Sequence, residues 1–97
     1  MATVIMQRWD GFTPEQYDAL RDVVGWDRDV PEGMRFHVAS FGDGILRMTD
    51  VWDSEEQFGV FVETRIVPGL QQLGIAGQPE MLVAPAHELT DARSATA

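Results

Sequence analysis

A strand followed by a capped helix occurs twice in this chain, and this repetition limits the folds that the chain can form. Residues 9–16 read WDGFTPEQ and residues 52–57 read WDSEEQ. A hydroxyl side chain with Gln three positions later is typical of a capping box, which begins a helix. Because an apolar run precedes each segment, we expect two similar strand–helix–strand halves. Ninety-seven residues suffice for one such domain and are too few for two.

The first half begins with a predicted strand at residues 3–9, TVIMQRW, which are mostly β-branched or apolar. Thr13 is expected to cap the helix that follows, and Pro14 suits its first position. Helical spacing places three apolar or aromatic residues on one face of this helix: Tyr17, Leu20 and either Val24 or Val23. Gly25 weakens the helix, and the polar residues 26–33 predict a loop.

The second half begins with a hairpin. Residues 34–41 and 45–52 predict two strands, and Asp43-Gly44 between them is a strong hairpin signal. Ser54 is expected to cap the next helix. The amphipathic face of that helix consists of Phe58, Phe61, Val62, Arg65 and Ile66.

The remaining chain contains signals for a helix end and for one more strand. Pro68-Gly69 is expected to kink or end the second helix, and residues 70–73 could add one further turn. Residues 80–87 predict the last strand, whose Pro85 suits an edge or a strand end. Residues 90–97 have no apolar pattern and predict a flexible tail after a single domain at residues 1–89.

This order predicts an α+β fold, the ferredoxin-like βαββαβ plait. Two right-handed βαβ units interleave into a four-stranded antiparallel sheet, with both helices on one face. A two-residue turn at Asp43-Gly44 pairs His37 with Asp50 and Arg35 with Trp52 across the hairpin. Both faces of the hairpin then carry apolar side chains, so both faces should be covered. Helices cover one face, and the sheet of a second subunit is expected to cover the other.

Several of these features together resemble the dimeric α+β barrel superfamily, which includes the antibiotic-biosynthesis-monooxygenase-type proteins. The resemblance covers about residues 2–88, and its motifs are the hairpin HVASFGDGILRMTDVWDS, the helix after Trp52-Asp53-Ser54, and the closing Pro85-Ala86-His87. It implies a plait that pairs sheet to sheet as a homodimer. The superfamily hosts several chemistries, so the resemblance leaves the reaction open.

The pair formed by His37 and Asp50 is the candidate catalytic site. Directly opposed residues of a hairpin lie close enough for a carboxylate to orient an imidazole, and such an imidazole is a general base near neutral pH. The alternative is a purely structural polar pair. The candidate substrate-binding residues are Arg35, Trp52, Tyr17, Phe61 and Arg65, which offer anion-binding groups and aromatic walls. Trp26 is expected to be a core residue.

Charge and composition exclude several kinds of function. The net charge is −9 and all seven cations are arginine, so we expect no binding to nucleic acid or to an anionic membrane. The absence of cysteine removes thiolate chemistry and Cys-ligated metals, and the two histidines show no ligand spacing. We therefore expect no metal and no cofactor. Because there is no signal peptide or membrane span, a cytoplasmic location is expected.

Three functions remain open. The first is a protein that binds an apolar or aromatic metabolite between sheet and helices, with an unassigned reaction. The second, which the resemblance implies for some relatives, is a cofactor-independent monooxygenase acting on a phenolic or polyketide-like substrate. The third is a dimeric module without catalysis. Haem degradation is not expected. The haem-degrading relatives use an Asn–Trp–His set, with the Trp and the His on the second helix. This chain has no asparagine, and residues 54–78, which include its second helix, contain neither Trp nor His.

Overall fold

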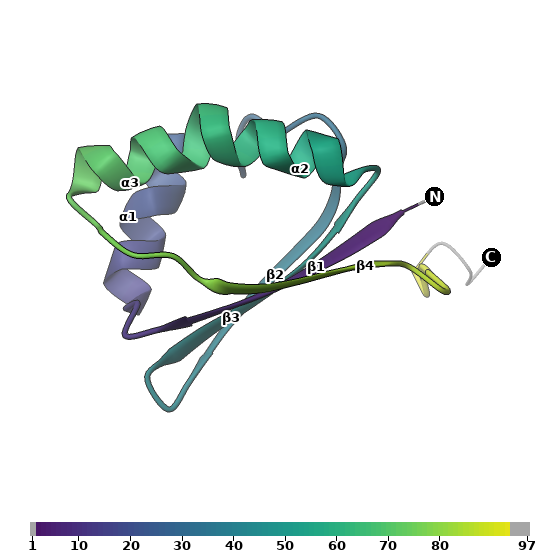
Figure 1. Ribbon diagram of the computed structural model, residues 1–97, viewed down its shortest axis with the longest axis horizontal. Coiled ribbons are helices and arrows are strands. Elements are labelled where there is room, and N and C mark those ends of the chain that lie inside the picture. The colour runs from purple at the N-terminus through teal and green to yellow at the C-terminus, as the bar shows by residue number, and fades with distance from the viewer. Residues whose placement is uncertain (1, 94–97) are drawn as a thin grey trace.

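The computed structural model describes residues 2–93 and contains one sheet with helices on one face of it (Figure 1). The four strands lie in the order β2-β3-β1-β4, and every neighbouring pair is antiparallel. This arrangement confirms the predicted ferredoxin-like plait. Along the chain the elements are β1 (Thr3–Asp10), α1 (Pro14–Val24), β2 (Met34–Gly42), β3 (Ile45–Trp52), α2 (Glu55–Phe61), the π-helical turn η1 (Val62–Ile66), α3 (Val67–Leu73) and β4 (Glu80–Pro85).

Both helix starts follow from the predicted caps, although only the first forms a full capping box. Thr13 Oγ1 accepts a hydrogen bond from the Gln16 N–H, and the Gln16 side chain accepts one from the Thr13 N–H. Ser54 Oγ likewise accepts from the Gln57 N–H, but the Gln57 side chain bonds to the Ser54 hydroxyl instead of to its backbone. Each cap satisfies an N–H group that the first turn of a helix leaves unpaired.

The β2–β3 hairpin has the predicted two-residue turn. Asp43 and Gly44 both have positive φ, 54° and 73°, as a type I′ turn requires. The resulting register places His37 opposite Asp50, as predicted. The predicted pair of Arg35 with Trp52 is wrong, because a bulge shifts the register and Met34 lies opposite Trp52 instead. One extra residue in β2, Arg35, is thereby left without a partner in the ladder.

Strand β4 ends at Pro85, two residues earlier than predicted. Its partner β1 begins at Thr3, directly opposite Pro85, so the residues after Pro85 have no strand beside them. Of the predicted tail at residues 90–97, the last four residues lie outside the described part of the chain.

Pro68-Gly69 was expected either to kink or to end the helical segment that follows Ser54. The segment does not end there. It continues from α2 through η1 into α3, where Pro68 occupies the first turn. The Val67 N–H bonds to the Val62 carbonyl, five residues back, and this wider turn precedes the proline, which has no N–H to donate. Gly69 then permits close packing of α3 on α1, because a Cβ there would lie 2.7 Å from a Val24 methyl carbon.

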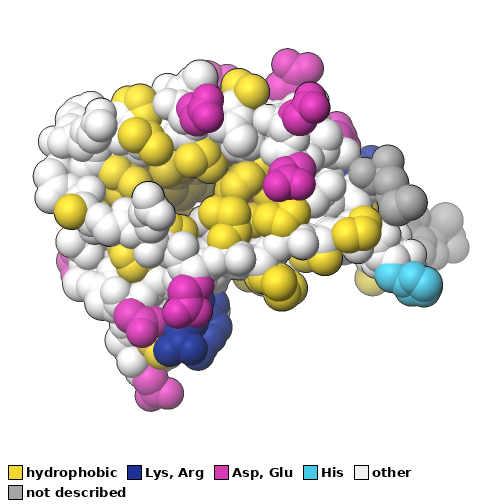
Figure 2. Space-filling model, viewed as in Figure 1, with side chains coloured by type: hydrophobic (Ala, Val, Ile, Leu, Met, Phe, Trp, Pro, Cys, Tyr) yellow, Lys and Arg dark blue, Asp and Glu magenta, His cyan; other side chains and the backbone are white. Residues whose placement is uncertain are grey.

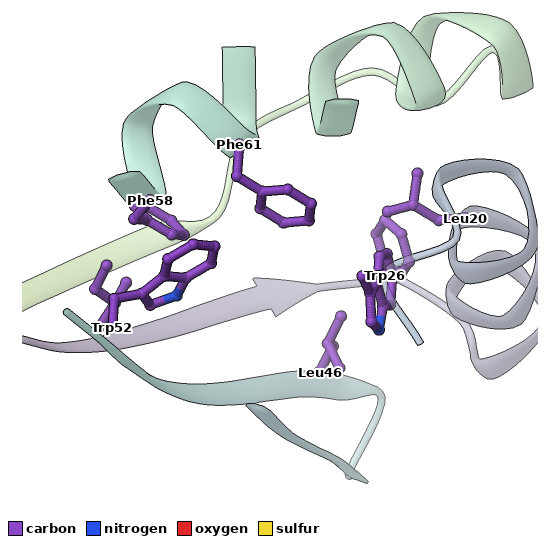
Figure 3. Close-up of a cluster of buried hydrophobic side chains, with 8 residues drawn as sticks. Leu20, Trp26, Leu46, Trp52, Phe58 and Phe61 are labelled. Atoms are coloured by element: carbon purple, nitrogen blue, oxygen red, sulfur yellow. The ribbon is translucent and has the colours of Figure 1, made fainter. Parts of the chain in front are cut away.

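The two faces of the sheet differ in what covers them. The buried core lies under the helices, where Phe58 and Phe61 project from α2 onto Trp52 (Figure 3). On the other face, neighbouring apolar side chains stay exposed: Met6, Phe36, Val38 and Leu82. We call these four residues the outer patch. Their exposure agrees with the expectation that both faces of the sheet are apolar.

Candidate functional site

A cavity of about 390 Å³ lies between the helices and the sheet. Figure 2 shows it as a hollow with hydrophobic walls. Its floor comes from β1, β3 and β2, and its walls come from α1, the helices after Ser54 and the segment before β4. This volume lies in the range of roughly 300–1,000 Å³ that is typical of small-molecule sites.

A chain of hydrogen bonds joins four side chains at the β2 side of this cavity. His37 Nδ1 lies 2.6 Å from Asp50 Oδ1, and His37 Nε2 lies 2.8 Å from the Tyr17 hydroxyl. Trp52 Nε1–H donates to Asp50 Oδ2 over 3.1 Å. Asp50 is 3% exposed, so its carboxylate is buried with a partner on each oxygen. The predicted pairing of His37 with Asp50 is therefore present, and Tyr17 extends it.

The direction of the hydrogen bonds follows from the indole N–H of Trp52 together with an ionised Asp50 and a neutral His37. An indole N–H can only donate, so Asp50 Oδ2 must accept. With Asp50 ionised, Oδ1 accepts from His37 Nδ1–H, and Nε2 of the neutral imidazole is the acceptor for the Tyr17 O–H. The order of donation is thus from Tyr17 to His37 and from His37 to Asp50. The same order lets His37 receive a proton at Nε2 and hold it against a buried carboxylate.

Tyr17 meets the cavity as a neutral phenol. Burial raises the pKa of its hydroxyl above the usual 10, and the negative charge of Asp50 raises it further, whereas the positive charge of Arg21 lowers it. The ring is held among aromatic neighbours, with Trp26 and Phe41 both edge-on to it at centroid distances of 5.6 and 6.1 Å. This packing keeps the hydroxyl directed along the hydrogen-bond chain.

Of the predicted site residues, four border the cavity and three lie outside its lining. The four are Tyr17, His37, Asp50 and Phe61. Trp52 is completely buried beneath Phe61 and Phe58 and acts on Asp50, so it offers no stacking surface to a ligand.

The two predicted arginines also lie outside the cavity lining. Arg35, displaced by the bulge, forms an exposed ion pair with Asp53 at 3.1 Å. Arg65 donates to the backbone carbonyls of Val24 and Asp29, and its guanidinium lies 5.4 Å from the centre of the Phe61 ring. Arg65 thus ties the end of α1 and the following loop to the helix that carries it.

Trp26 and Gln7 are two of the cavity residues that were not singled out as site residues in the sequence. Trp26 is buried, as expected, but it also forms a wall of the cavity, where its ring lies edge-on to His37 at 5.6 Å. Gln7 lies on the cavity floor. The strict alternation of β1, with Ile5 and Trp9 on the same side as Gln7, was a signal that could have placed it there.

Two other kinds of site are absent from residues 2–93. In this part of the chain, no three His, Asp or Glu side chains gather closely enough to hold a metal ion. Within the same residues, no helix has the length and apolar character needed to cross a membrane.

Comparison with known proteins identifies the fold. Neither a protein-family model nor a curated protein sequence matches the chain. Solved structures do match over nearly their whole length. A protein of Chloroflexus aurantiacus J-10-fl, described as an antibiotic biosynthesis monooxygenase, has a TM-score of 0.67 at 15% identity, covering 94% of this chain and 98% of that one. This chain has the fold of the antibiotic biosynthesis monooxygenases.

Two other structures with the antibiotic biosynthesis monooxygenase fold have different descriptions. SnoaB, a cofactor-independent oxygenase from Streptomyces nogalater, has a TM-score of 0.63 at 13% identity and covers 91% of this chain and 94% of its own. A Nitrosomonas europaea protein of unknown function has a TM-score of 0.64 at 16% identity, with 92% of each chain covered. At these identities the similarity concerns the fold and carries no reaction with it.

Proposed function

We propose that the protein binds a small aromatic molecule with an acidic hydroxyl group in the cavity and removes its proton. The observation that carries this proposal is the hydrogen-bond chain of Tyr17, His37 and Asp50 at the wall of an otherwise largely apolar cavity. Apolar walls favour a flat, hydrophobic ligand, and a few convergent polar groups orient it. An imidazole held by a carboxylate supplies the base.

The proton passes in two coupled transfers. The ligand hydroxyl donates to the Tyr17 oxygen, and the Tyr17 proton moves along its existing 2.8 Å hydrogen bond to His37 Nε2. The products are a ligand anion, a neutral tyrosine and an imidazolium that Asp50 stabilises. Because the raised pKa of Tyr17 disfavours a lasting tyrosinate, the proton rests on His37.

We extend the proposal to cofactor-independent monooxygenation of an electron-rich ring system. The anion formed by deprotonation is electron-rich enough to react with dioxygen. In the balanced reaction, a ring CH₂ and O₂ give a ring C=O and water, so one oxygen atom enters the product and the other leaves with the two hydrogens. The support for this step is the fold shared with SnoaB, which is described as a cofactor-independent oxygenase.

The alternative is a binding protein without turnover. It is favoured by the position of the Tyr17 hydroxyl, which already occupies His37 Nε2. In that case the hydrogen-bond chain serves to hold Tyr17 in the wall, and the ligand stays unchanged.

We also propose that the functional unit is a homodimer joined through the outer patch. Exposure of Val38 at 61% and of Leu82 at 60%, next to Met6 and Phe36, creates an apolar sheet surface that water would cover in a monomer. A second copy of this surface is its natural complement, because a two-fold interface is self-complementary.

Two probes test the reaction. 1-Naphthol reports binding and ionisation, since its neutral and ionised forms absorb differently; anthrone has a CH₂ that O₂ converts to C=O. We expect the wild-type protein to lower the apparent pKa of bound 1-naphthol and to consume one O₂ per anthrone oxidised. Replacing His37 with Phe should abolish both effects, whereas His87→Phe, at the exposed second histidine, should preserve them.

The outcomes separate the candidate functions. Binding of 1-naphthol without a change in its pKa, together with no O₂ uptake, would support the binding protein. If 1-naphthol and anthrone both fail to bind to a folded wild-type protein, the cavity does not serve aromatic ligands and the proposal is wrong.

A further inference from the structure

The hydrogen-bond chain beside the cavity has the order of groups that activates a hydroxyl nucleophile. The Tyr17 oxygen lies 2.8 Å from His37 Nε2, and His37 Nδ1 lies 2.6 Å from Asp50 Oδ1. A hydroxyl, an imidazole that takes its proton and a carboxylate that orients the imidazole together turn a weak nucleophile into a reactive one. The Tyr17 oxygen is therefore placed to attack an electrophilic carbon as well as to relay a proton.

The side chains of this hydrogen-bond chain are held in place by contacts outside it. Trp52 Nε1–H donates to the second oxygen of Asp50, which is buried. The ring of Trp26 lies edge-on to both Tyr17 and His37, at centroid distances of 5.6 Å. Because these side chains are already ordered, little further conformational freedom is lost when a substrate reaches them.

The phenol of Tyr17 determines which acyl donors are suitable. A tyrosine ester is itself an aryl ester, so an acyl group moves to Tyr17 only from a donor activated to a similar degree, such as an aryl ester or a thioester. The acylated tyrosine is also readily hydrolysed, because a phenolate is a better leaving group than an alkoxide. Burial raises the pKa of Tyr17 and keeps it protonated, so His37 must take the proton during the attack.

The space in front of Tyr17 suits an apolar acyl group. Tyr17 and His37 both line the cavity of about 390 Å³. Aromatic and aliphatic side chains form most of the remaining wall, among them Leu20, Phe58 and Phe61. Because burial of each CH₂ group against such a wall is favourable, an acyl chain of several carbons should bind better than an acetyl group.

We propose that the protein has a second activity, the hydrolysis of activated acyl esters through an acyl-tyrosine intermediate at Tyr17. In the first step His37 Nε2 takes the Tyr17 proton while the Tyr17 oxygen bonds to the acyl carbon. The bond from that carbon to the aryl oxygen or thiol sulfur then breaks, and the leaving group takes the proton from His37. This activity goes beyond the proposed function, in which no bond forms between Tyr17 and the ligand.

The second step restores Tyr17. His37 Nε2 removes a proton from water, and the water oxygen bonds to the acyl carbon. The Tyr17 oxygen then leaves that carbon and recovers a proton from His37. The products of the whole reaction are a carboxylic acid and a phenol or thiol, and nothing is oxidised or reduced.

The test uses p-nitrophenyl hexanoate, whose p-nitrophenolate product absorbs visible light. We expect a rapid burst of about one p-nitrophenolate per subunit and then slower release, because acylation and hydrolysis are separate steps. Mass spectrometry during the burst should show one added hexanoyl group, which peptide mapping places on Tyr17. Few other groups compete for the label, since the chain contains no lysine or cysteine and Tyr17 is its only tyrosine. The burst with p-nitrophenyl acetate should be at least about 10-fold slower, because the acetyl group buries fewer CH₂ groups.

Four variants separate the roles of the side chains. Tyr17→Phe should abolish both the burst and the label, and His37→Phe should slow the burst by at least about 100-fold, within the range of general-base effects. Asp50→Asn should slow it similarly, because the new amide makes His37 Nε2 a donor that cannot take the Tyr17 proton. His87→Phe, at the exposed second histidine, is the matched control and should keep the wild-type burst. Thermal melting verifies that each variant is folded.

Three results would overturn the inference. The first is a folded wild-type protein that shows neither burst nor label. The second is a label on the N-terminal amine or a histidine with Tyr17 unmodified. The third is faster hydrolysis by Tyr17→Phe than by the wild-type protein, which would assign the attack to His37, whose Nε2 loses its hydroxyl partner in that variant. Each would leave the proposed function standing, since that reaction is followed with 1-naphthol and O₂ and forms no bond to Tyr17.

Discussion

The indole of Trp52 determines how the carboxylate of Asp50 can act, through a hydrogen bond of 3.1 Å between Nε1 and Oδ2. Trp52 and Asp50 are two residues apart on β3 and therefore project from the same face. Since the indole occupies one carboxylate oxygen, the other is left for His37. Trp52 thus contributes to the site as a positioning residue, without touching the cavity.

Replacing Asp50 with Asn should preserve the fold and abolish proton transfer. The new amide oxygen can still accept from Trp52, but the NH₂ group then faces His37 Nδ1 and makes that atom an acceptor. His37 Nε2 consequently carries the hydrogen and donates to Tyr17, so it can no longer take a proton. We expect at least about a 100-fold loss of anthrone oxidation, within the range of general-base effects.

The matching variant Asp50→Ala leaves the Trp52 N–H buried without a partner. We expect it to lower the free energy of unfolding by about 1–3 kcal/mol. Urea denaturation of both variants separates the two effects. Equal loss of stability in Asp50→Ala and Asp50→Asn, with activity following the folded fraction, would assign the pair a structural role.

The pKa of Tyr17 can be measured directly, because Tyr17 is the only tyrosine in the sequence. An ultraviolet titration of tyrosinate should give a midpoint above 10, owing first to burial. Asp50→Asn should lower that midpoint by removing a negative charge, whereas Arg21→Gln should raise it. A wild-type midpoint at or below 10 would contradict the burial of this hydroxyl.

The same pKa predicts how stability depends on pH. Above about pH 10 the unfolded chain loses its tyrosine proton, whereas the folded chain retains it up to a higher pH. The folded state then binds more protons, so the free energy of unfolding falls as pH rises through this window. Tyr17→Phe should weaken this dependence, as measured by urea denaturation at several alkaline pH values.

The homodimer is tested by two valines with nearly equal exposure. Val38 lies in the outer patch and is 61% exposed, whereas Val60 lies on α2 and is 59% exposed. Val38→Asp should raise the dissociation constant of the dimer by at least about 100-fold, because it places a charge in an apolar interface. Val60→Asp should leave it unchanged. Sedimentation velocity measures both, and a wild-type protein that is monomeric at high micromolar concentration would contradict the dimer.

Packing of α1 against α3 is tested by two glycines. Gly69→Ala places a methyl group against Val24 and should destabilise the protein by about 1–3 kcal/mol. A methyl group added at Gly59, in α2, would have nothing within 4 Å of it, so Gly59→Ala should stabilise the protein by about 0.5–1 kcal/mol. Thermal unfolding measures the stability of both variants. An equal change in stability for Gly69→Ala and Gly59→Ala would mean that α1 and α3 separate easily to admit the added methyl group.

The fold could be predicted because each of its signals is local. Thr13 and Ser54 cap their helices within three residues, and Asp43-Gly44 determines the hairpin register through two backbone conformations. The pairing of His37 with Asp50 follows from that register alone. Arg35 was misplaced because a bulge depends on how the strand meets its surroundings, which the alternation of the sequence does not record.

The site was predicted less completely because its contacts are not local. Tyr17 reaches His37 across twenty positions of sequence, and this contact depends on how α1 lies on the sheet. Arg65 was expected to bind a substrate, but it bonds to backbone carbonyls at the end of α1 and in the following loop, which no side-chain pattern indicates. Whether these groups act on a ligand stays a prediction.

The cavity makes the stability of the protein depend on its contents. A chain of 97 residues has little interior, and about 390 Å³ of it is left without side chains. The side chains that line the cavity therefore gain their missing van der Waals contacts only when a ligand is bound. A ligand that binds the folded state shifts the folding equilibrium in proportion to the logarithm of its concentration. Substitutions that fill the cavity should accordingly give a more heat-resistant protein that no longer responds to ligands.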